Sequence, residues 1–227
     1  VDADYSQIEL RLLAHISGDE TMRSAFLTGE DIHAVTASQV FGIPLDEVTP
    51  QMRSHAKAVN FGIVYGISAF SLAQDIGVRP KEAQAYIDAY LEKYHGVREY
   101  MEKVISQAKH DGYVSTLFGR RRPMPELKSP NRNMRAFGER VARNMPIQGT
   151  AADIMKLAMV NAHRRMQAEG LQSRLILQVH DELIAECPED EAEQVKKLLE
   201  EEMSGAVSLS VPLTANAKTG HSWAEAH

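Results

Sequence analysis

The chain has 227 residues and a net charge of −6, and 44% of its residues are hydrophobic and 25% charged. These values are ordinary for a folded globular protein, and they exclude a disordered or collagen-like chain. Its one cysteine, Cys187, excludes an internal disulfide, and the absence of any charge-free stretch of about 18 apolar residues excludes a membrane-spanning helix.

Helix signals dominate the first half of the chain. Thr49 and Pro50 suit the N-cap and first position of a helix, because Thr accepts a backbone hydrogen bond and Pro lacks an N–H group. That helix should run to about Val64, because Tyr65 and Gly66 offer a stop. Further helices are predicted for residues 10–17, 34–40, 80–94 and 97–110.

The second half mixes strands with helices. A strand or hairpin arm is predicted for 113–118, and three prolines predict an irregular segment over 120–131. A long helical region should span 133–170 with interruptions at Pro146 and Gly149. Two apolar strands over 175–179 and 183–186 predict a tight antiparallel hairpin, followed by a helix over 189–203. The expected fold class is α+β, mostly helical with a small antiparallel sheet.

The charge is divided unevenly along the chain. Residues 120–143 hold seven arginines and one lysine against two acids, a net charge of +6. Residues 181–206 hold ten acids against two lysines, a net charge of −8. The overall acidic balance therefore does not decide whether nucleic acid is a partner.

Two acidic segments are candidates for a cation site. Asp2 and Asp4 alternate on a probable strand and share one face, which is either a cation site or a solvated acidic turn. Asp181 and Glu182 follow an apolar strand at the hairpin tip, where Mg²⁺ would relieve their repulsion. A polar hairpin tip that faces water is the plainer interpretation.

A third segment combines cations with aromatic rings on one helix. Residues four apart lie on one side of a helix, so Arg53, Lys57 and Phe61 form a stripe with Tyr65 at its edge. No acid within the stripe neutralises Arg53 or Lys57, and the pattern suits a polyphosphate attached to a base. The alternative is a partly buried helix with no ligand, whose Lys and Arg side chains extend along its surface to reach water.

Together the three segments resemble a known family. The sequences DYSQIELR (4–11), R-x3-K-x3-F-G-x2-Y-G (53–66) and HDE (180–182) are similar to motifs A, B and C of the family A DNA polymerases, in the same order. The likeness also includes FGRRR (118–122) and QGTAAD (148–153), and it extends over nearly the whole chain.

The resemblance implies template-directed DNA synthesis, in which a nucleotidyl group passes from a dNTP to a primer 3′-hydroxyl. Asp4 and Asp181 would hold two Mg²⁺ ions together with the Tyr5 carbonyl, and Glu182 would be an accessory acid. Lys57 is also expected to protonate the leaving group. The expected setting is bacterial DNA replication and repair in the cytoplasm, associated with the nucleoid.

The resemblance also implies a substrate site. Arg53, Lys57 and His33 would contact the triphosphate, and Phe61 and Tyr65 would shape the pocket for the new base pair. Glu9 would block a ribose 2′-hydroxyl and so select deoxynucleotides. The remaining residues assigned by resemblance are Gln7 near the nucleotide and Arg140, Asn144, Gln148 and His180 along the primer–template DNA.

The same likeness predicts the organisation of the chain. Residues 1–30 and 126–227 would form two parts of a palm, with the motif C hairpin near 174–187. Residues 31–125 would form the fingers, with the motif B helix near 50–64. The opening at Val1 predicts a piece of a longer protein without its thumb and nuclease domains, and hence a weak grip on DNA.

Three other functions stay open at this point. The chain could be a truncated, non-catalytic fragment that only binds nucleotide or nucleic acid. It could be a related single-subunit RNA polymerase, although Glu9 favours deoxynucleotides. An α+β domain whose motifs coincide by chance is the plainest alternative.

Overall fold

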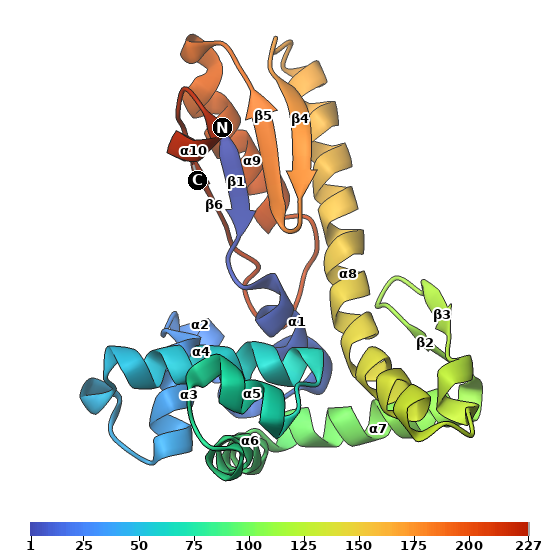
Figure 1. Ribbon diagram of the computed structural model, residues 1–227. Helices are drawn as coiled ribbons and strands as arrows, with labels where there is room; N and C mark the ends of the chain where they lie inside the picture. The colour runs from blue at the N-terminus through green and yellow to red at the C-terminus, as the bar shows by residue number, and fades with distance from the viewer. Residues whose placement is uncertain (227) are drawn as a thin grey trace. The chain divides into compact units, whose positions relative to one another are not determined.

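The computed structural model describes residues 1–226, which form two compact units. The first, called here the sheet unit, comprises residues 1–8 and 150–226. The second, the helical unit, is Glu9–Gly149. The predicted α+β class is confirmed, because helices predominate and the larger of the two antiparallel sheets has only four strands (Figure 1).

The sheet unit is built on four antiparallel strands in the order β4-β5-β1-β6 (Figure 1). The predicted hairpin is confirmed: Val179 pairs with Glu182 across a two-residue turn. The last strand was not predicted, because its sequence, ANAK, has neither branched nor aromatic residues. The strands are β1 (Asp2–Tyr5), β4 (Arg174–Val179), β5 (Glu182–Glu186) and β6 (Ala215–Lys218).

Helix α9 (Ala192–Ser204) covers one face of this sheet, with Val195, Leu198 and Leu199 buried (Figure 1). Its start differs slightly from the prediction, because residues 189–191 form a short 3-10 turn, η3. The short helix α10 (Trp223–Ala226) follows β6.

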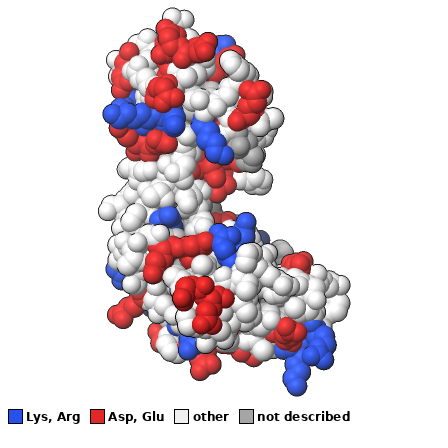
Figure 2. All heavy atoms as spheres, turned by 90° about the vertical axis from the view of Figure 1, so that its left-hand side faces the viewer, with Lys and Arg blue, Asp and Glu red and all other residues white. Residues whose placement is uncertain are grey.

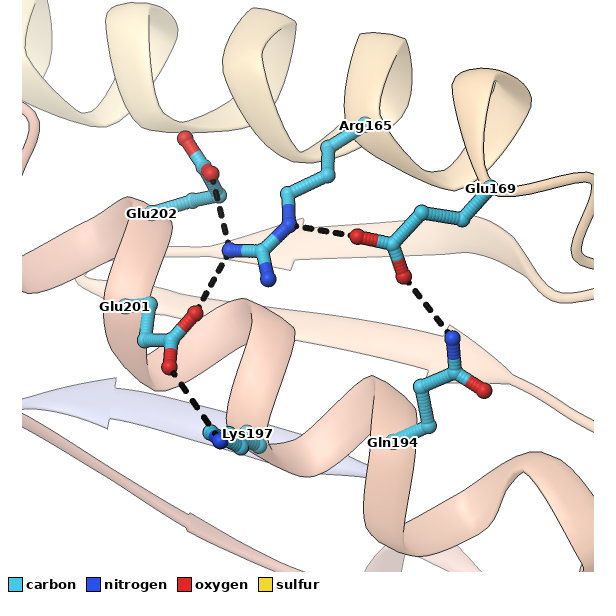
Figure 3. A network of polar contacts seen from close by, with 6 residues as sticks. All are labelled: Arg165, Glu169, Gln194, Lys197, Glu201 and Glu202. Atoms are coloured by element: carbon cyan, nitrogen blue, oxygen red, sulfur yellow. Dashed lines mark hydrogen bonds and ion pairs between the residues drawn. The ribbon is translucent and has the colours of Figure 1, made fainter.

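The acidic side of α9 is tied to the C-terminal part of α8 (Arg132–Ala168) through one arginine. The guanidinium of Arg165 lies 2.7 Å from Glu169, 2.7 Å from Glu201 and 3.1 Å from Glu202 (Figure 3). Lys197 and Gln194 extend the network at its ends. Part of the acidic segment over residues 181–206 therefore has a structural partner in Arg165.

The predicted interruption of α8 is wrong, because the helix is continuous through Pro146 and Gly149. Pro146 removes one backbone donor, but Ala142 and Ile147 on either side of it are fully buried, and their packing favours a continuous helix. Gly149 lets Thr116 pack closely against α8, since a Cβ on residue 149 would lie 2.7 Å from Cγ2 of Thr116.

The helical unit holds helices α1 to α7, the first part of α8 and a small hairpin. The predicted helices are confirmed as α1 (Ile8–Ser17), α3 (Ile32–Phe41), α4 (Pro50–Tyr65), α6 (Pro80–Lys93) and α7 (His95–Asp111). Strand β2 (Tyr113–Ser115) pairs with β3 (Arg121–Pro123), which lies in the segment predicted to be irregular. Two short 3-10 turns, η1 (Leu45–Glu47) and η2 (Pro125–Lys128), complete the unit.

Two helices of this unit were not predicted, although their caps are visible in the sequence. Helix α2 (Glu20–Thr28) begins after Asp19, which accepts a hydrogen bond from the Met22 amide, and ends at Gly29. Helix α5 (Ala69–Ile76) is capped in the same way, by Ser68 at its start and Gly77 at its end. Both helices have nine residues or fewer, so their apolar periodicity is short.

Charged side chains are intermixed on the face drawn in Figure 2, and no continuous basic surface crosses it. Among residues 1–226, no helix is long and apolar enough to cross a membrane.

Candidate functional site

In the sheet unit, strand pairing brings the motif A and motif C carboxylates to one end of the sheet. Asp4 lies directly opposite Glu182, because β1 and β5 are antiparallel. The Tyr5 amide donates a hydrogen bond to the carbonyl oxygen of Asp181 at 3.1 Å. The backbone thus holds both segments together where β1 ends and β5 begins.

The side chains at this sheet end have two different environments. Asp4 is exposed and Asp181 is half-buried, so these two carboxylates are accessible. Glu182 is also half-buried, and its Oε2 atom is enclosed by protein. Tyr5 is buried, and its hydroxyl donates to the Met203 carbonyl at 2.8 Å. Burial raises the pKa of Tyr5 well above its ordinary value, so the phenol stays neutral and anchors β1 on α9.

The donor set at this position fits Mg²⁺. Within residues 1–226, no three acidic, His or Cys side chains gather into a complete cation cage. Mg²⁺ does not need such a cage, because it usually takes one or two protein carboxylates and fills its remaining positions with water and substrate phosphate oxygens. Asp4 on β1 and Asp181 in the β4–β5 turn provide two such carboxylates, and backbone pairing holds their segments together.

Two residues beside these carboxylates have positive φ angles, which non-glycine residues rarely adopt. Gln7, just after β1, has a φ of 56°, and His180, in the β4–β5 turn, has a φ of 49°. The His180 carbonyl accepts a hydrogen bond from Nε2 of Gln178 at 2.7 Å. No other non-glycine residue among 1–226 has a positive φ, so the unusual backbone is confined to these two places.

In the helical unit, α4 carries the cationic and aromatic stripe. The Thr49 side chain accepts a hydrogen bond from the Met52 amide, and Gly66 closes the helix with a φ of 67°, as the sequence predicted. Arg53, Lys57 and Phe61 therefore share one side of a continuous helix. Arg53 and Lys57 are exposed, and Phe61 is half-buried.

Arg53 pairs with an acid that lies outside α4, although no acid within the stripe itself neutralises it. Nε of Arg53 lies 2.5 Å from Oδ2 of Asp31, and the other oxygen of Asp31 caps α3 through the His33 and Ala34 amides. Burial alone would raise the pKa of Asp31. The hydrogen bonds and the Arg53 charge have the larger combined effect, so the pKa of Asp31 lies below its ordinary value. Lys57 keeps an exposed ammonium on the same helix.

His33 lies deeper than expected for a surface ligand. It is 2% exposed, its Nδ1 is 3.0 Å from Nδ2 of Asn60, and its ring centroid is 5.8 Å from that of Phe61. Burial lowers the pKa of His33 to about 4; Asp31 opposes the shift, and Arg53 and Lys57 add to it. His33 is therefore neutral at pH 7, and its contact with a triphosphate stays a prediction.

Tyr65 and Glu9 meet at the end of α4. The Tyr65 hydroxyl donates to Oε2 of Glu9 at 2.8 Å. Phe61 and Tyr65 line one cavity of about 600 Å³, together with Gly66 and Arg140. The two aromatic residues that the sequence assigned to a base-pair pocket thus do line a common cavity.

The three α8 residues predicted to follow DNA are spaced four apart on one helix. Arg140 packs beside Gly66, where a Cβ would lie 3.1 Å from the Arg140 Cγ. Nδ2 of Asn144 donates to the Val64 carbonyl at 3.4 Å, and Gln148 is exposed. The fourth predicted residue, His180, belongs to the sheet unit.

Sequence reasoning missed the polar residues behind α4. Asn60 and Thr36 are completely buried and bonded to one another, and Thr36 is bonded to the Tyr94 hydroxyl. Asp31 was missed as the partner of Arg53. One feature of the sequence could have indicated this network: Asn60 occupies a position on the apolar face of the helix. A buried Asn side chain needs hydrogen-bond partners.

Comparison with known proteins identifies the family. The profile of DNA polymerase family A matches residues 1–225, so the chain belongs to that family. DNA polymerase I of Caldicellulosiruptor bescii is 53% identical over 225 residues, which are 99% of this chain and 26% of the relative. DNA polymerase I of Bacillus subtilis (strain 168) is 54% identical over 224 residues, again 99% and 26%.

A solved structure agrees with these relatives. It is described as the POL domain of Pol1 from M. smegmatis in complex with DNA primer-template and dNTP. Its TM-score is 0.94 at 48% identity, and the match covers 99% of this chain and 40% of that one. The chain spans about a quarter of the length of the curated relatives that it matches.

Proposed function

We propose that this chain carries the nucleotidyl-transfer machinery of a DNA polymerase, which joins a dNTP to the 3′-hydroxyl of a primer on a template. The observation that supports this most directly is the pairing of β1 with β5, which puts Asp4 and Asp181 at one end of the sheet. Membership of DNA polymerase family A supports the same reaction.

Two Mg²⁺ ions are the proposed cofactors, and when bound they supply charge stabilisation and lower the pKa of the attacking hydroxyl. Asp4 and Asp181 would hold them, with the Tyr5 carbonyl as a further ligand. Glu182, opposite Asp4, would serve as an accessory acid. Phosphoryl transfer of this kind depends on positioning and charge more than on covalent chemistry.

Helix α4 is the proposed binding element for the nucleotide. Arg53 and Lys57 are exposed on one side of α4, where they would bind the triphosphate oxygens. Lys57 would also give a proton to the leaving pyrophosphate, and His33 would add a third, neutral contact. Phe61 and Tyr65, which line one cavity, would hold the base.

Sugar selection and DNA contact are assigned to the neighbouring residues. Glu9 would exclude a 2′-hydroxyl, with its carboxylate held by Tyr65. Gln7 would lie near the nucleotide. The primer–template DNA would be followed by Arg140, Asn144, Gln148 and His180, while the basic segment 120–143 neutralises template phosphates.

The subdomain assignment follows from this proposal. Residues 1–30 and 126–227 would belong to the palm, and 31–125 to the fingers, in a longer polymerase that also has a thumb and nuclease domains. DNA replication and repair in the bacterial cytoplasm would be its setting.

Primer extension tests the proposal. The purified chain is given a short primed template, the four dNTPs and Mg²⁺ at low salt, because a chain with few phosphate contacts binds DNA weakly at high salt. Extension that stops when the Mg²⁺ is chelated is the expected result. Arg53→Ala and Lys57→Ala should each raise the apparent KM for dNTP, whereas Lys81→Ala, at the exposed start of α6, should not.

A chain that binds dNTP through Arg53 and Lys57 but extends no primer would contradict catalysis. It would instead match a fragment that only binds nucleotide.

A further inference from the structure

Asn60 lies at the centre of a buried polar network that joins α3 and α4 to the end of α6. Its Nδ2 is 3.0 Å from Nδ1 of His33 and 3.1 Å from Oγ1 of Thr36. Thr36 Oγ1 is in turn 3.0 Å from the Tyr94 hydroxyl. Asn60, Thr36 and Tyr94 are completely buried, so each polar atom depends on the others for its hydrogen bonds.

This geometry determines where the proton of His33 sits. The amide nitrogen of Asn60 can only donate, so Nδ1 of His33 must accept and cannot carry a hydrogen. A neutral imidazole whose Nδ1 accepts carries its hydrogen on Nε2. The network therefore selects the tautomer in which Nε2 is a hydrogen-bond donor.

The ring orientation is held as well. Phe61, the residue after Asn60, packs against the ring at a tilt of 41° with centroids 5.8 Å apart. Asn60 and Phe61 thus touch His33 from one helix, and Asp31 precedes it at the cap of α3. The charged groups that face His33 are Asp31 on its own segment and Arg53 and Lys57 on α4.

We propose that Asn60 is a positioning residue for nucleotide binding, which fixes the Nε2–H tautomer of His33 so that the imidazole donates a neutral hydrogen bond to a triphosphate oxygen. This inference rests on the proposed function of α4. A neutral donor is suited to a helix that already carries two cations, because it adds a directional bond without further charge repulsion.

The tautomer can be measured directly by ¹⁵N-histidine NMR, through the long-range couplings of the ring nitrogens, with the His33 signals identified by comparison with a His33→Gln sample. Wild type at pH 8 should show Nε2–H. Asn60→Asp replaces the donor by an acceptor of the same shape, so the ring should change to Nδ1–H and its pKa should rise. Asn133→Asp adds the same charge at an exposed position and should leave the tautomer unchanged.

Nucleotide binding provides the second readout. At pH 8, Asn60→Asp should raise the apparent KM for dNTP roughly fivefold with little change in kcat, as expected when one hydrogen bond to bound substrate is lost. As the pH falls through the raised pKa of His33, both ring nitrogens become donors, so the KM of the variant should return toward the wild-type value. Loss of packing alone would not be repaired by lowering the pH.

Two results would overturn the inference. An Nδ1–H signal in wild-type His33 would contradict the tautomer even if every variant folded poorly. A changed tautomer in Asn60→Asp with an unchanged KM for dNTP would refute the role in binding. Failure of the proposed function is separate, because then Arg53→Ala would also leave dNTP binding unchanged.

Discussion

The hydroxyl of Tyr65, at the last position of α4, donates a hydrogen bond to the carboxylate of Glu9 near the start of α1, with an oxygen–oxygen distance of 2.8 Å. Glu side chains have several rotatable bonds and lose entropy when fixed. The bond from Tyr65 therefore defines where the carboxylate lies, next to a residue that itself lines the cavity together with Phe61.

Glu9→Ala should relax the selection of deoxynucleotides, because it removes the group proposed to clash with a ribose 2′-hydroxyl. The ratio of kcat/KM for dNTP to that for the matching rNTP should fall by at least about tenfold. Tyr65→Phe keeps Glu9 but frees its carboxylate, so the fall should be smaller, about threefold. An unchanged ratio in Glu9→Ala would refute the role of Glu9.

Asp31→Asn should change how the stability of the chain depends on pH. Because the folded-state pKa of Asp31 is lowered, its ionised form stabilises the fold above its unfolded-state pKa of about 4. That stabilisation is lost as the pH falls through the lower folded-state pKa. The free energy of unfolding should therefore drop less on acidification in Asp31→Asn than in wild type.

Urea unfolding at pH 7 and pH 3 measures this difference. The ion pair with Arg53 is partly exposed, so the gap between the two proteins at pH 7 should be only about 0.5 kcal/mol and should narrow at pH 3. Asp46→Asn, at an exposed position in η1, is the matched control. A gap that widens toward pH 3 would contradict the assignment.

His180→Gly should separate stability from function in the β4–β5 turn. The φ of 49° is costly for His and free of strain for Gly, although Gly also increases the entropy of the unfolded chain. The melting temperature should therefore stay the same or rise, with a net gain of up to about 1 kcal/mol. Primer extension should weaken, because the proposed DNA contact is lost. A clear fall in melting temperature would instead indicate that the imidazole holds the hairpin.

Arg165→Gln should destabilise the sheet unit in a way that salt reduces. The substitution leaves Glu169, Glu201 and Glu202 close together without their shared cation (Figure 3). The like charges then repel, and added salt screens them. Arg174→Gln is the control, because Arg174 pairs with Glu186 alone at a more exposed place. Equal melting temperatures of the two variants at low salt would refute a special role for Arg165.

Much of the fold follows from local signals in the sequence. The caps Thr49 and Gly66 define α4 to within one residue, and the hairpin around His180 follows from two apolar runs separated by a short polar tip. The same local view failed at Pro146, where packing of α8 outweighs the proline penalty. It also failed at β6, whose register with β1 depends on strands far away in the chain.

The candidate site was also predicted only in part from local signals in the sequence. Arg53, Lys57 and Phe61 could be placed on one stripe because a helix has a fixed period. The hydrogen-bond partners of residues on α4 could not be predicted in this way. Asp31 is 22 residues away from Arg53 in the sequence, and Thr36 is 24 residues away from Asn60. Burial of His33 likewise depends on packing between α3 and α4, which no spacing rule within either helix contains.

The most direct test of the account is the rate of primer extension by Asp181→Ala beside wild type, with Asp190→Ala as an exposed acidic control on the same unit. The account predicts extension by wild type and the control, and a loss of more than about a hundredfold in Asp181→Ala with its fold intact by circular dichroism. Extension by Asp181→Ala at the wild-type rate would contradict the claim that the carboxylates at the end of β1 and β5 carry out the chemistry.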